Sequence, residues 1–186
     1  MSWVPVSSHR LHLRLWRDED AEAFHRIWGD PEVVFWGPAR DVEASRAMLA
    51  RVRARCEGLP SPIGWHAIID ATTGEAVGNV MLQPAPFAPG ELEVGWHLRR
   101  DRWGRGYATE AARTLMAQAF ESPSLTRLVC AILWSNARSQ GVAARLGFAR
   151  KARDVFHGGL LHDVWAVHRA EFASSRRSGG RPLPHV

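Results

Sequence analysis

A glycine-rich turn at the start of a helix is the feature that most limits how this chain can fold. Residues 99–112 read RRDRWGRGYATEAA, with Gly104 and Gly106 placed two residues apart among arginines. A strand-like alternation over 91–99 precedes the turn, and a helical pattern over about 105–120 follows it. Because the first turn of a helix leaves backbone N–H groups unbonded and partly positive, this unit predicts an anion-binding site in a mixed α/β fold.

The remaining patterns predict one α/β layer architecture in the order β-α-α-β-β-β-α-β-α-β-β. About seven strands are expected, over 9–16, 64–70, 76–84, 91–99, 127–134 and on both sides of His157–Gly159. About four helices are expected, over 18–28, 41–56, 105–120 and 136–147. Asp18 is expected to cap the first helix.

The chain has 186 residues, of which 46% are hydrophobic, and this suits a single domain with a real core. We assign that domain to residues 1–172. Residues 173–186 read ASSRRSGGRPLPHV, without an acid and rich in glycine, proline and serine. We expect this basic tail to be disordered, because such a composition buries too little surface to order itself.

The formal net charge is +5. Nearly all of the positively charged residues are arginines, and some of them lie in the tail. Without aromatic residues interleaved on a basic face, nucleic acid is not an expected partner, except for proximity to the ribosome. No apolar run is long enough to predict a membrane helix, and no signal peptide is expected. Cys56 and Cys130 lack CxxC spacing, so we expect reduced cysteines, a cytoplasmic protein and no metal site.

Three explanations of the glycine turn compete with a simple turn among solvated arginines. The dinucleotide fingerprint fails, because its third small position falls on Thr109 and repeated βαβ units are absent from the predicted order. The Walker A pattern fails, because the sequence contains no Gly-Lys-Ser/Thr. The third fits: residues 103–108 (WGRGYA) resemble the Q/R-x-x-G-x-G/A loop of the GNAT N-acetyltransferases, with Trp103 departing at the first position.

The resemblance extends over about residues 9–172. The segments HRLHLRLWRDEDAEAFHRIWGDPEV, ELEVGWHL and NARSQGVAARLGF are similar to the opening, the strand and the Asn-x-x-Ser…Leu-Gly-Phe segment of the branch that acetylates ribosomal-protein N-termini, the RimJ/RimL type. This family likeness implies a single mixed, mostly antiparallel twisted sheet. It also implies transfer of an acetyl group from acetyl-CoA to a primary amine by direct attack in a ternary complex.

The resemblance also implies how acetyl-CoA is bound. Backbone N–H groups of Arg105, Gly106, Tyr107 and Ala108 would hold the pyrophosphate, with Trp103 and Gly104 shaping the loop. The pantetheine arm would pair with the backbone of Trp96, His97 and Leu98, one of whose N–H groups would stabilise the oxyanion. Trp96 could equally be a core residue, since it alternates with Val94 and Leu98.

Glu93 is the first candidate for the base that accepts the proton of the amine. Its ordinary pKa of about 4.3 would have to be raised by burial for this role, and it could instead be a solvated residue at a strand end. His97 shares its strand face and is the runner-up, with a more suitable ordinary pKa. His66 is a weaker third candidate.

Many members of the family place a tyrosine acid at the position that is Ala143 here. The resemblance to the ribosomal branch implies Ser139 as the group that stabilises the leaving thiolate. Asn136 would contact the pantetheine amide, although an N-cap of the following helix explains the same residue.

Phe35 and Trp36 lie between the first two helices, where this family builds its acceptor site, and core packing explains them as well. The acceptor stays open between a protein N-terminus and a small molecule, and the protein between a monomer and a homodimer. The alternative function is a non-catalytic module that binds CoA or ribosomal RNA. The missing tyrosine favours that alternative, and Asn136, Ser139 and Glu93 argue against it.

Overall fold

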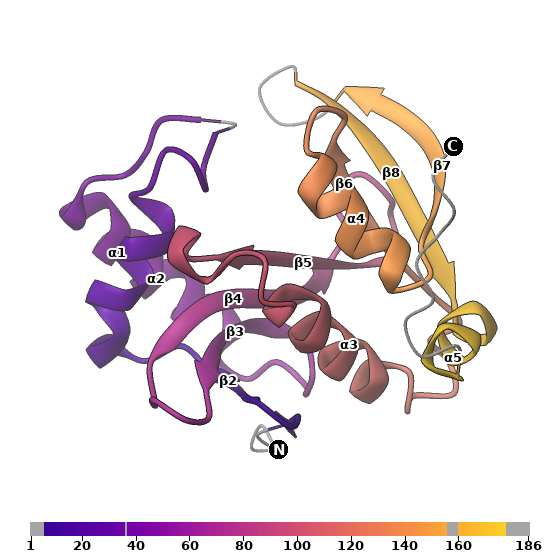
Figure 1. The fold of residues 1–186 in the computed structure, drawn as a ribbon, viewed down its shortest axis with the longest axis horizontal. Helices are drawn as coiled ribbons and strands as arrows, with labels where there is room; N and C mark the ends of the chain where they lie inside the picture. The colour runs from indigo at the N-terminus through magenta and orange to yellow at the C-terminus, as the bar shows by residue number, and fades with distance from the viewer. Residues whose placement is uncertain (1–5, 36, 156–159, 178–186) are drawn as a thin grey trace.

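One sheet of eight strands runs through the computed structural model, which describes residues 6–35, 37–155 and 160–177 (Figure 1). The strand order across the sheet is β1-β2-β3-β4-β5-β6-β8-β7. The strands are β1 (Val6–Ser7), β2 (Leu11–Leu15), β3 (Gly64–Asp70), β4 (Ala76–Pro84), β5 (Leu92–Leu98), β6 (Arg127–Leu133), β7 (Ala149–Val155) and β8 (Leu161–His168).

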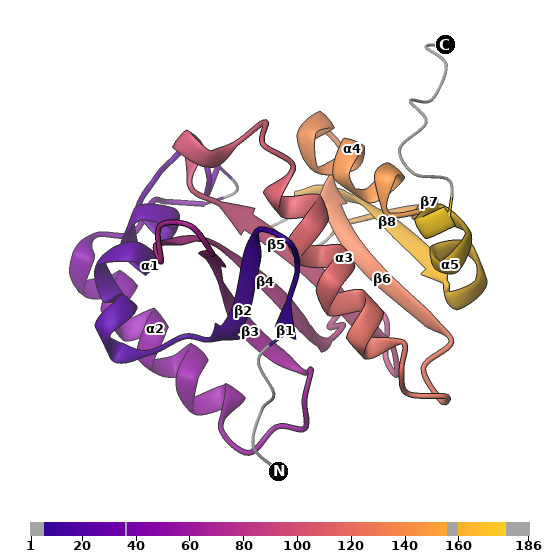
Figure 2. The ribbon, with the colours of Figure 1, turned by 60° about the horizontal axis from the view of Figure 1, so that its bottom comes forward.

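Helices cover both faces of this sheet (Figure 2). The five α-helices of the described chain are α1 (Ala21–Trp28), α2 (Val42–Cys56), α3 (Tyr107–Ala119), α4 (Ala137–Arg145) and α5 (Arg169–Arg177), and short 3-10 turns form η1 (Asp18–Asp20) and η2 (Arg100–Arg102). One core joins α3 and α4 to the sheet through residues such as Leu115 and Leu146, both fully buried. A second core joins α1 and α2 to the other face around Phe24 and Leu49.

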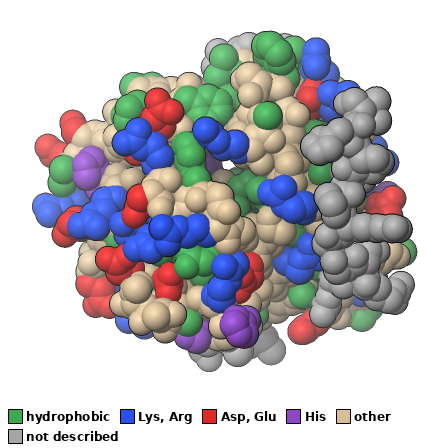
Figure 3. All heavy atoms as spheres, in the orientation of Figure 1, with side chains coloured by type: hydrophobic (Ala, Val, Ile, Leu, Met, Phe, Trp, Pro, Cys, Tyr) green, Lys and Arg blue, Asp and Glu red, His purple; other side chains and the backbone are tan. Residues whose placement is uncertain are grey.

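The sheet is antiparallel except where β5 meets β6. That parallel pair joins at one register position, Glu93 opposite Val129, while the other edge of β5 pairs with β4 along its whole length. Beyond the junction β5 and β6 diverge (Figure 1). In the same orientation, the space-filling view shows a hollow between β5 and α4, with Lys or Arg and apolar side chains on its rim (Figure 3).

The expected class, a single mixed sheet between helices, is confirmed, with eight strands instead of seven and five helices instead of four. The additional strand is β1, which adds two residues beside β2. The additional helix is α5: residues 173–177, expected in a disordered tail, continue it because Phe172 anchors it to the core. Residues 178–186 and Trp36 lie outside the described residues.

Asp18 does not cap the first helix, which was a wrong expectation. It opens η1, and the structure places Asp20 at the junction with α1. Asp20 accepts a hydrogen bond from the backbone N–H of Arg17 and pairs with Arg14 at 2.6 Å. Burial opposes ionisation of Asp20, but these hydrogen bonds prevail and lower the pKa of its carboxyl.

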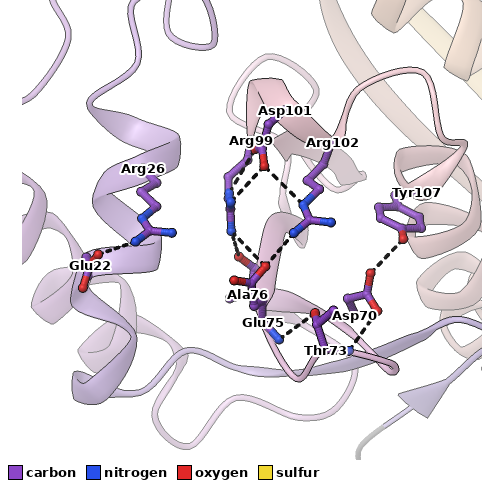
Figure 4. Close-up of polar contacts among 10 residues, drawn as sticks. All are labelled: Glu22, Arg26, Asp70, Thr73, Glu75, Ala76, Arg99, Asp101, Arg102 and Tyr107. Carbon is purple, nitrogen blue, oxygen red and sulfur yellow. Dashed lines mark hydrogen bonds and ion pairs between the residues drawn. The ribbon is translucent and has the colours of Figure 1, made fainter.

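The first residue of α3 is tied to the β3–β4 hairpin. The phenol of Tyr107 donates a hydrogen bond of 2.8 Å to Asp70 (Figure 4). Asp70 also accepts from the backbone N–H of Thr72 and Thr73 in the hairpin turn. The guanidinium of Arg10 lies 4.9 Å from the centre of the Tyr107 ring. These contacts fix the start of α3 relative to the sheet.

We predict that Tyr107→Phe lowers the free energy of unfolding by about 1–2 kcal/mol, because Asp70 loses a hydrogen bond to its charged carboxylate. The measurement is urea unfolding at neutral pH. A double-mutant cycle with Asp70→Ala should recover most of that energy as coupling between the two side chains. Additive effects would mean that the hydrogen bond contributes nothing of its own.

Candidate functional site

The turn between β5 and α3 has a backbone that favours glycine at two positions. Gly104 and Gly106 have φ of +75° and +78°, and Gly106 is the N-cap of α3. A Cβ built on Gly104 would find nothing within 4 Å. The conformation therefore explains the glycine, and the space beside it is open to a ligand. The helix following the turn adds its unbonded N–H groups on the same side.

Most of the arginines around this turn are bound to local acids (Figure 4). Arg102 pairs with Glu75 at 2.6 Å and with Asp101 at 3.3 Å, and Arg99 pairs with Asp101 at 2.9 Å. These ion pairs hold η2 against the start of β4. The stretch therefore carries less free positive charge than its sequence indicates.

The other two arginines of the turn, Arg100 and Arg105, differ in their contacts. Arg100 lies 3.5 Å from Asp30, in the segment after α1. Arg105 is exposed, and within the described chain it makes no ion pair. Arg105 is therefore the side chain of this stretch that is available for an anion.

Trp103 bridges the turn to two other elements. Its indole N–H donates to the backbone oxygen of Leu98 at 3.0 Å, which ties the turn to the end of β5. The guanidinium of Arg138, in the first turn of α4, lies 4.6 Å from the centre of the Trp103 ring. The N-terminal end of α4 is thereby held beside the turn before α3. Tyr107 and Ala108 are buried, so only their backbone can serve a ligand there.

The start of α4 brings Asn136 and Ser139 together. The Asn136 side chain accepts a hydrogen bond of 3.0 Å from the backbone N–H of Ser139, so Asn136 is the N-cap of α4. Its amide NH₂ group is still able to donate elsewhere. The Ser139 side chain is half-buried, and its hydroxyl makes no hydrogen bond among the described residues. Ala143 is fully buried in the core and supplies no acid.

Glu93 lies where β5 joins β6 and is buried, with 7% of its surface exposed. The side-chain amide of Gln83 donates a hydrogen bond of 3.1 Å to its carboxyl group. Burial raises the pKa of this carboxyl to about 7, although the hydrogen bonds from Gln83 and the backbone of Ala131 oppose the shift. Glu93 is therefore neither solvated nor permanently charged at neutral pH.

Trp96, His97 and Leu98 occupy alternate faces of β5. Trp96 and Leu98 pack on the core under α3, which favours the packing role for Trp96. His97 lies on the face of Glu93, with its ring 4.6 Å from that of Trp28. Burial lowers the pKa of His97 to about 4, so this imidazole is neutral at physiological pH. His66 is fully buried, and burial lowers its pKa to about 4 as well.

The family of this chain follows from its match to a known protein domain. The sequence profile of the acetyltransferase (GNAT) domain matches residues 10–149. The chain is a member of the GNAT family. The match includes the glycine turn, β5 and α4, and it agrees with the resemblance seen in the sequence, so the protein is an acetyltransferase.

Three known proteins illustrate the relationship. The N-acetyltransferase p20 of Bacillus licheniformis is 30% identical over 159 residues, 84% of each chain. The "Putative ribosomal N-acetyltransferase YdaF" of Bacillus subtilis is 31% identical over 94 residues, 49% of this chain and 51% of its own. A solved acetyltransferase from Agrobacterium tumefaciens superposes with a TM-score of 0.73 and 28% identity, covering 91% of this chain and 96% of that one.

Two residues connected to Glu93 by hydrogen bonds were not predicted from the sequence. Gln83 lies directly opposite Glu93 in the β4–β5 hairpin, and Trp65 on β3 donates its indole N–H to Gln83 at 2.9 Å. The sequence signal that could have found Gln83 was the short loop between the strands expected over 76–84 and 91–99, which indicates a hairpin. In the structure that hairpin is closed by a hydrogen bond of 2.9 Å from Ala85 N–H to the Glu91 oxygen. Counting two residues outward from that closure on each strand reaches Gln83 and Glu93.

Of the two residues expected at the acceptor site, Phe35 is described by the structure and Trp36 lies outside the described residues. Phe35 is 47% exposed, in the segment between α1 and α2, so it is not a core residue. That segment is held by a hydrogen bond of 3.1 Å from the Arg40 N–H to the Trp28 oxygen and by the Asp30–Arg100 pair. Metal-type clusters of three or more His, Cys, Asp or Glu are absent from the described residues, and no helix in that part of the chain could span a membrane.

We predict that the stability of the fold decreases with rising pH because of Glu93. Its pKa is about 4.3 in the unfolded chain and about 7 in the fold, so its contribution is fully present below about pH 4.3 and is lost as pH rises through about 7. Relative to Glu93→Gln, the wild-type protein should lose roughly 3 kcal/mol of unfolding free energy between pH 4 and 8. Urea unfolding of both proteins across this range is the measurement, and two parallel pH curves would contradict it.

Proposed function

We propose that this protein transfers the acetyl group of acetyl-CoA to a primary amine by direct attack in a ternary complex, with Glu93 as the base. The observation that carries the proposal is the buried Glu93 carboxyl at the point where β5 and β6 diverge. A carboxyl with a pKa of about 7 can accept a proton at neutral pH and release it again. Glu93 stands at the start of the edge of β5 that β6 leaves unpaired.

The residues present fit acetyl-CoA. The backbone N–H groups of residues 105–108 at the start of α3, the open space at Gly104 and the free Arg105 suit a pyrophosphate. The edge of β5 beyond Glu93 offers backbone groups to an extended amide-containing arm, because β6 has turned away from it. When bound, acetyl-CoA supplies an activated thioester. The Asn136 amide NH₂ would donate to the arm.

The protein's part in the reaction then divides among three groups. Glu93 removes a proton from the amine nitrogen as that nitrogen forms its bond to the carbonyl carbon. A backbone N–H between Trp96 and Leu98 donates to the oxygen that becomes negative. The Ser139 hydroxyl donates a hydrogen bond to the departing sulfur, since Ala143 leaves no tyrosine to protonate it. His97 is the second candidate for the base, but its lowered pKa makes it the weaker proton acceptor.

The acceptor is best described as a primary amine presented beside Phe35. Its exposed ring, on a segment fixed to α1, could contact an apolar part of the acceptor. The partial similarity to a protein named for ribosomal acetylation favours a protein N-terminal amine over a small molecule. Both cysteines are buried and free, which supports the cytoplasm as the compartment.

Thiol release from acetyl-CoA, measured over a panel of N-terminal peptides, polyamines and other amines, tests the proposal. No release above background with any amine would favour the non-catalytic CoA-binding alternative.

We predict that Gly104→Ala raises the KM for acetyl-CoA several-fold, because its methyl group enters the space for the pyrophosphate. Gly74→Ala is the matched control: Gly74 has φ of +72°, and a Cβ there also finds nothing within 4 Å. Both variants should lose about 1–2 kcal/mol of stability from the left-handed backbone. An equal change of KM in the two variants would count against the cofactor site.

We predict that Glu93→Gln lowers kcat by about 10²–10⁴-fold, as loss of a general base does. In the wild-type protein, kcat/KM should rise with pH through about 7 as the carboxyl ionises. Glu91→Gln, which removes the carboxylate paired with Arg127 at 3.6 Å, is the control and should keep its activity. Activity retained in Glu93→Gln and lost in His97→Ala would reverse the assignment of the base.

We predict that Ser139→Ala lowers kcat by about tenfold to a hundredfold, the range for one hydrogen bond to a charged group. The KM for the amine should stay near its wild-type value. Ser135→Ala, an exposed serine in the turn before α4, serves as the control. Since the Asn136 cap bonds the backbone of Ser139 and not its hydroxyl, the fold should be unaffected in both variants. Unchanged turnover of Ser139→Ala would remove the serine from the mechanism.

A further inference from the structure

We propose that Gln83 is a positioning residue for the Glu93 carboxylate, and that the indole of Trp65 sets the direction in which the Gln83 amide points. The inference rests on the proposed function, since it takes Glu93 as the base. It stands on a chain of two hydrogen bonds across three adjacent strands, from Trp65 on β3 through Gln83 on β4 to Glu93 on β5.

The direction of the Gln83 amide follows from the chemistry of its neighbours. An indole N–H can only donate, so the atom of Gln83 that lies 2.9 Å from Trp65 must be the oxygen. The NH₂ group is then left on the other side, 3.1 Å from the Glu93 carboxyl. Trp65 thus turns a side chain with two possible orientations into a donor aimed at Glu93.

The sheet and an aromatic stack hold this chain in place. Gln83 and Glu93 are direct partners in the antiparallel β4–β5 register, so their side chains lie opposite each other on one face of the sheet. Trp65 is opposite Met81, one step along the same face, and its ring stacks on that of Trp28 with centroids 5.5 Å apart. The stack limits the rotation of the indole and so preserves the N–H direction.

A donor aimed at Glu93 acts on two properties of the carboxylate. It holds one oxygen toward β4, so that the other is directed away from Gln83. It also favours the charged form, which opposes the effect of burial. Without that hydrogen bond, the buried carboxyl would keep its proton to a higher pH and would be protonated in more of the molecules.

Few other groups near Glu93 can carry charge. On β6, Cys130 is a buried thiol whose pKa burial and the nearby Glu93 raise well above its usual range, so it stays neutral. On β5 itself, His97 is neutral because burial lowers its pKa to about 4. From β3 and β4 the neighbours are Trp65 and Gln83, and within the described part of the chain no charged side chain of α1, α2 or α4 shifts the pKa of Glu93. Gln83 is therefore the side-chain donor on which its charged form depends.

The test uses the full chain with Gln83→Met, which keeps the length of the side chain and removes the donor. Two quantities are measured: the pH dependence of kcat/KM and the ¹³C chemical shift of the Glu93 carboxyl during a pH titration. We expect both midpoints to move upward by about one pH unit, the size of one hydrogen bond to a charged group. The KM for acetyl-CoA should stay unchanged, because Gln83 lies on the opposite face from the α3 core.

Trp65→Phe is the second variant, since its ring can still stack on Trp28. It should move both midpoints in the same direction by less, because the Gln83 amide can then turn over. In the Gln83→Met background it should cause no additional shift. Gln118→Met is the matched control: its amide donates to Ser61 at 3.3 Å at the far end of α3, and both midpoints should equal those of the wild-type protein.

A Gln83→Met protein that is folded and has an unchanged ¹³C midpoint would overturn the proposal. So would a full additional shift from Trp65→Phe in the Gln83→Met background. If the ¹³C midpoint moves while the kinetic midpoint does not, Gln83 is confirmed as the residue that positions Glu93, and the assignment of Glu93 as the base is what fails. The carboxyl titration thus separates the failure of this inference from the failure of the proposed function.

Discussion

The pairing of β5 with β6 is the interaction on which the rest of the site depends. Strands β1 to β5 form one antiparallel group and β6 to β8 another, and the two groups meet in parallel at Glu93 and Val129. Because the strands part immediately afterwards, one edge of β5 has no neighbouring strand beside the helix that follows it. The hollow in Figure 3 lies between β5 and α4. A longer parallel pairing would have closed this edge with backbone hydrogen bonds.

The same junction explains why one carboxyl in the sheet has unusual acidity. At the junction the Glu93 carboxyl is buried and loses its water, which raises its pKa. His97, four residues further along β5 on the same face, is also buried. Burial lowers the pKa of an imidazole, because its charged form is the protonated one. Burial therefore brings the pKa of Glu93 close to neutral pH and takes the pKa of His97 away from it. The ordinary pKa values of the two side chains would have favoured the histidine as the base.

Much of the fold could be predicted because local patterns determine it. The strands expected over 64–70 and 76–84 coincide with β3 and β4, and the helix after Asp41 begins at the cap that its side chain provides. The helix α5 was missed because its anchor, Phe172, is a single apolar residue next to a polar tail. The two-residue strand β1 is too short to show any alternation, and it exists only through its pairing with β2.

The site was less predictable, because its contacts are made across the sheet. The sequence showed Glu93 and the glycine turn, whose residue types and spacing are informative by themselves. Gln83 carries no such pattern, and its role follows only from the register that places it opposite Glu93. Trp65 looked like an ordinary strand residue, although its single donor determines the orientation of its neighbour. In this site, side chains that cannot titrate set the chemistry of the one that does.

The binding capacity of the arginines around the glycine turn also could not be predicted from the sequence alone. Counted along the sequence, they indicate a strong attraction for anions. In the structure, Arg99 and Arg102 neutralise Glu75 and Asp101 and thereby fasten the turn to the hairpin, so most of that charge contributes to position and not to binding. An anion at the start of α3 would meet the backbone N–H groups and Arg105. Since backbone N–H groups cannot move away, the ion pairs contribute to binding indirectly, by keeping the turn in the conformation that presents them.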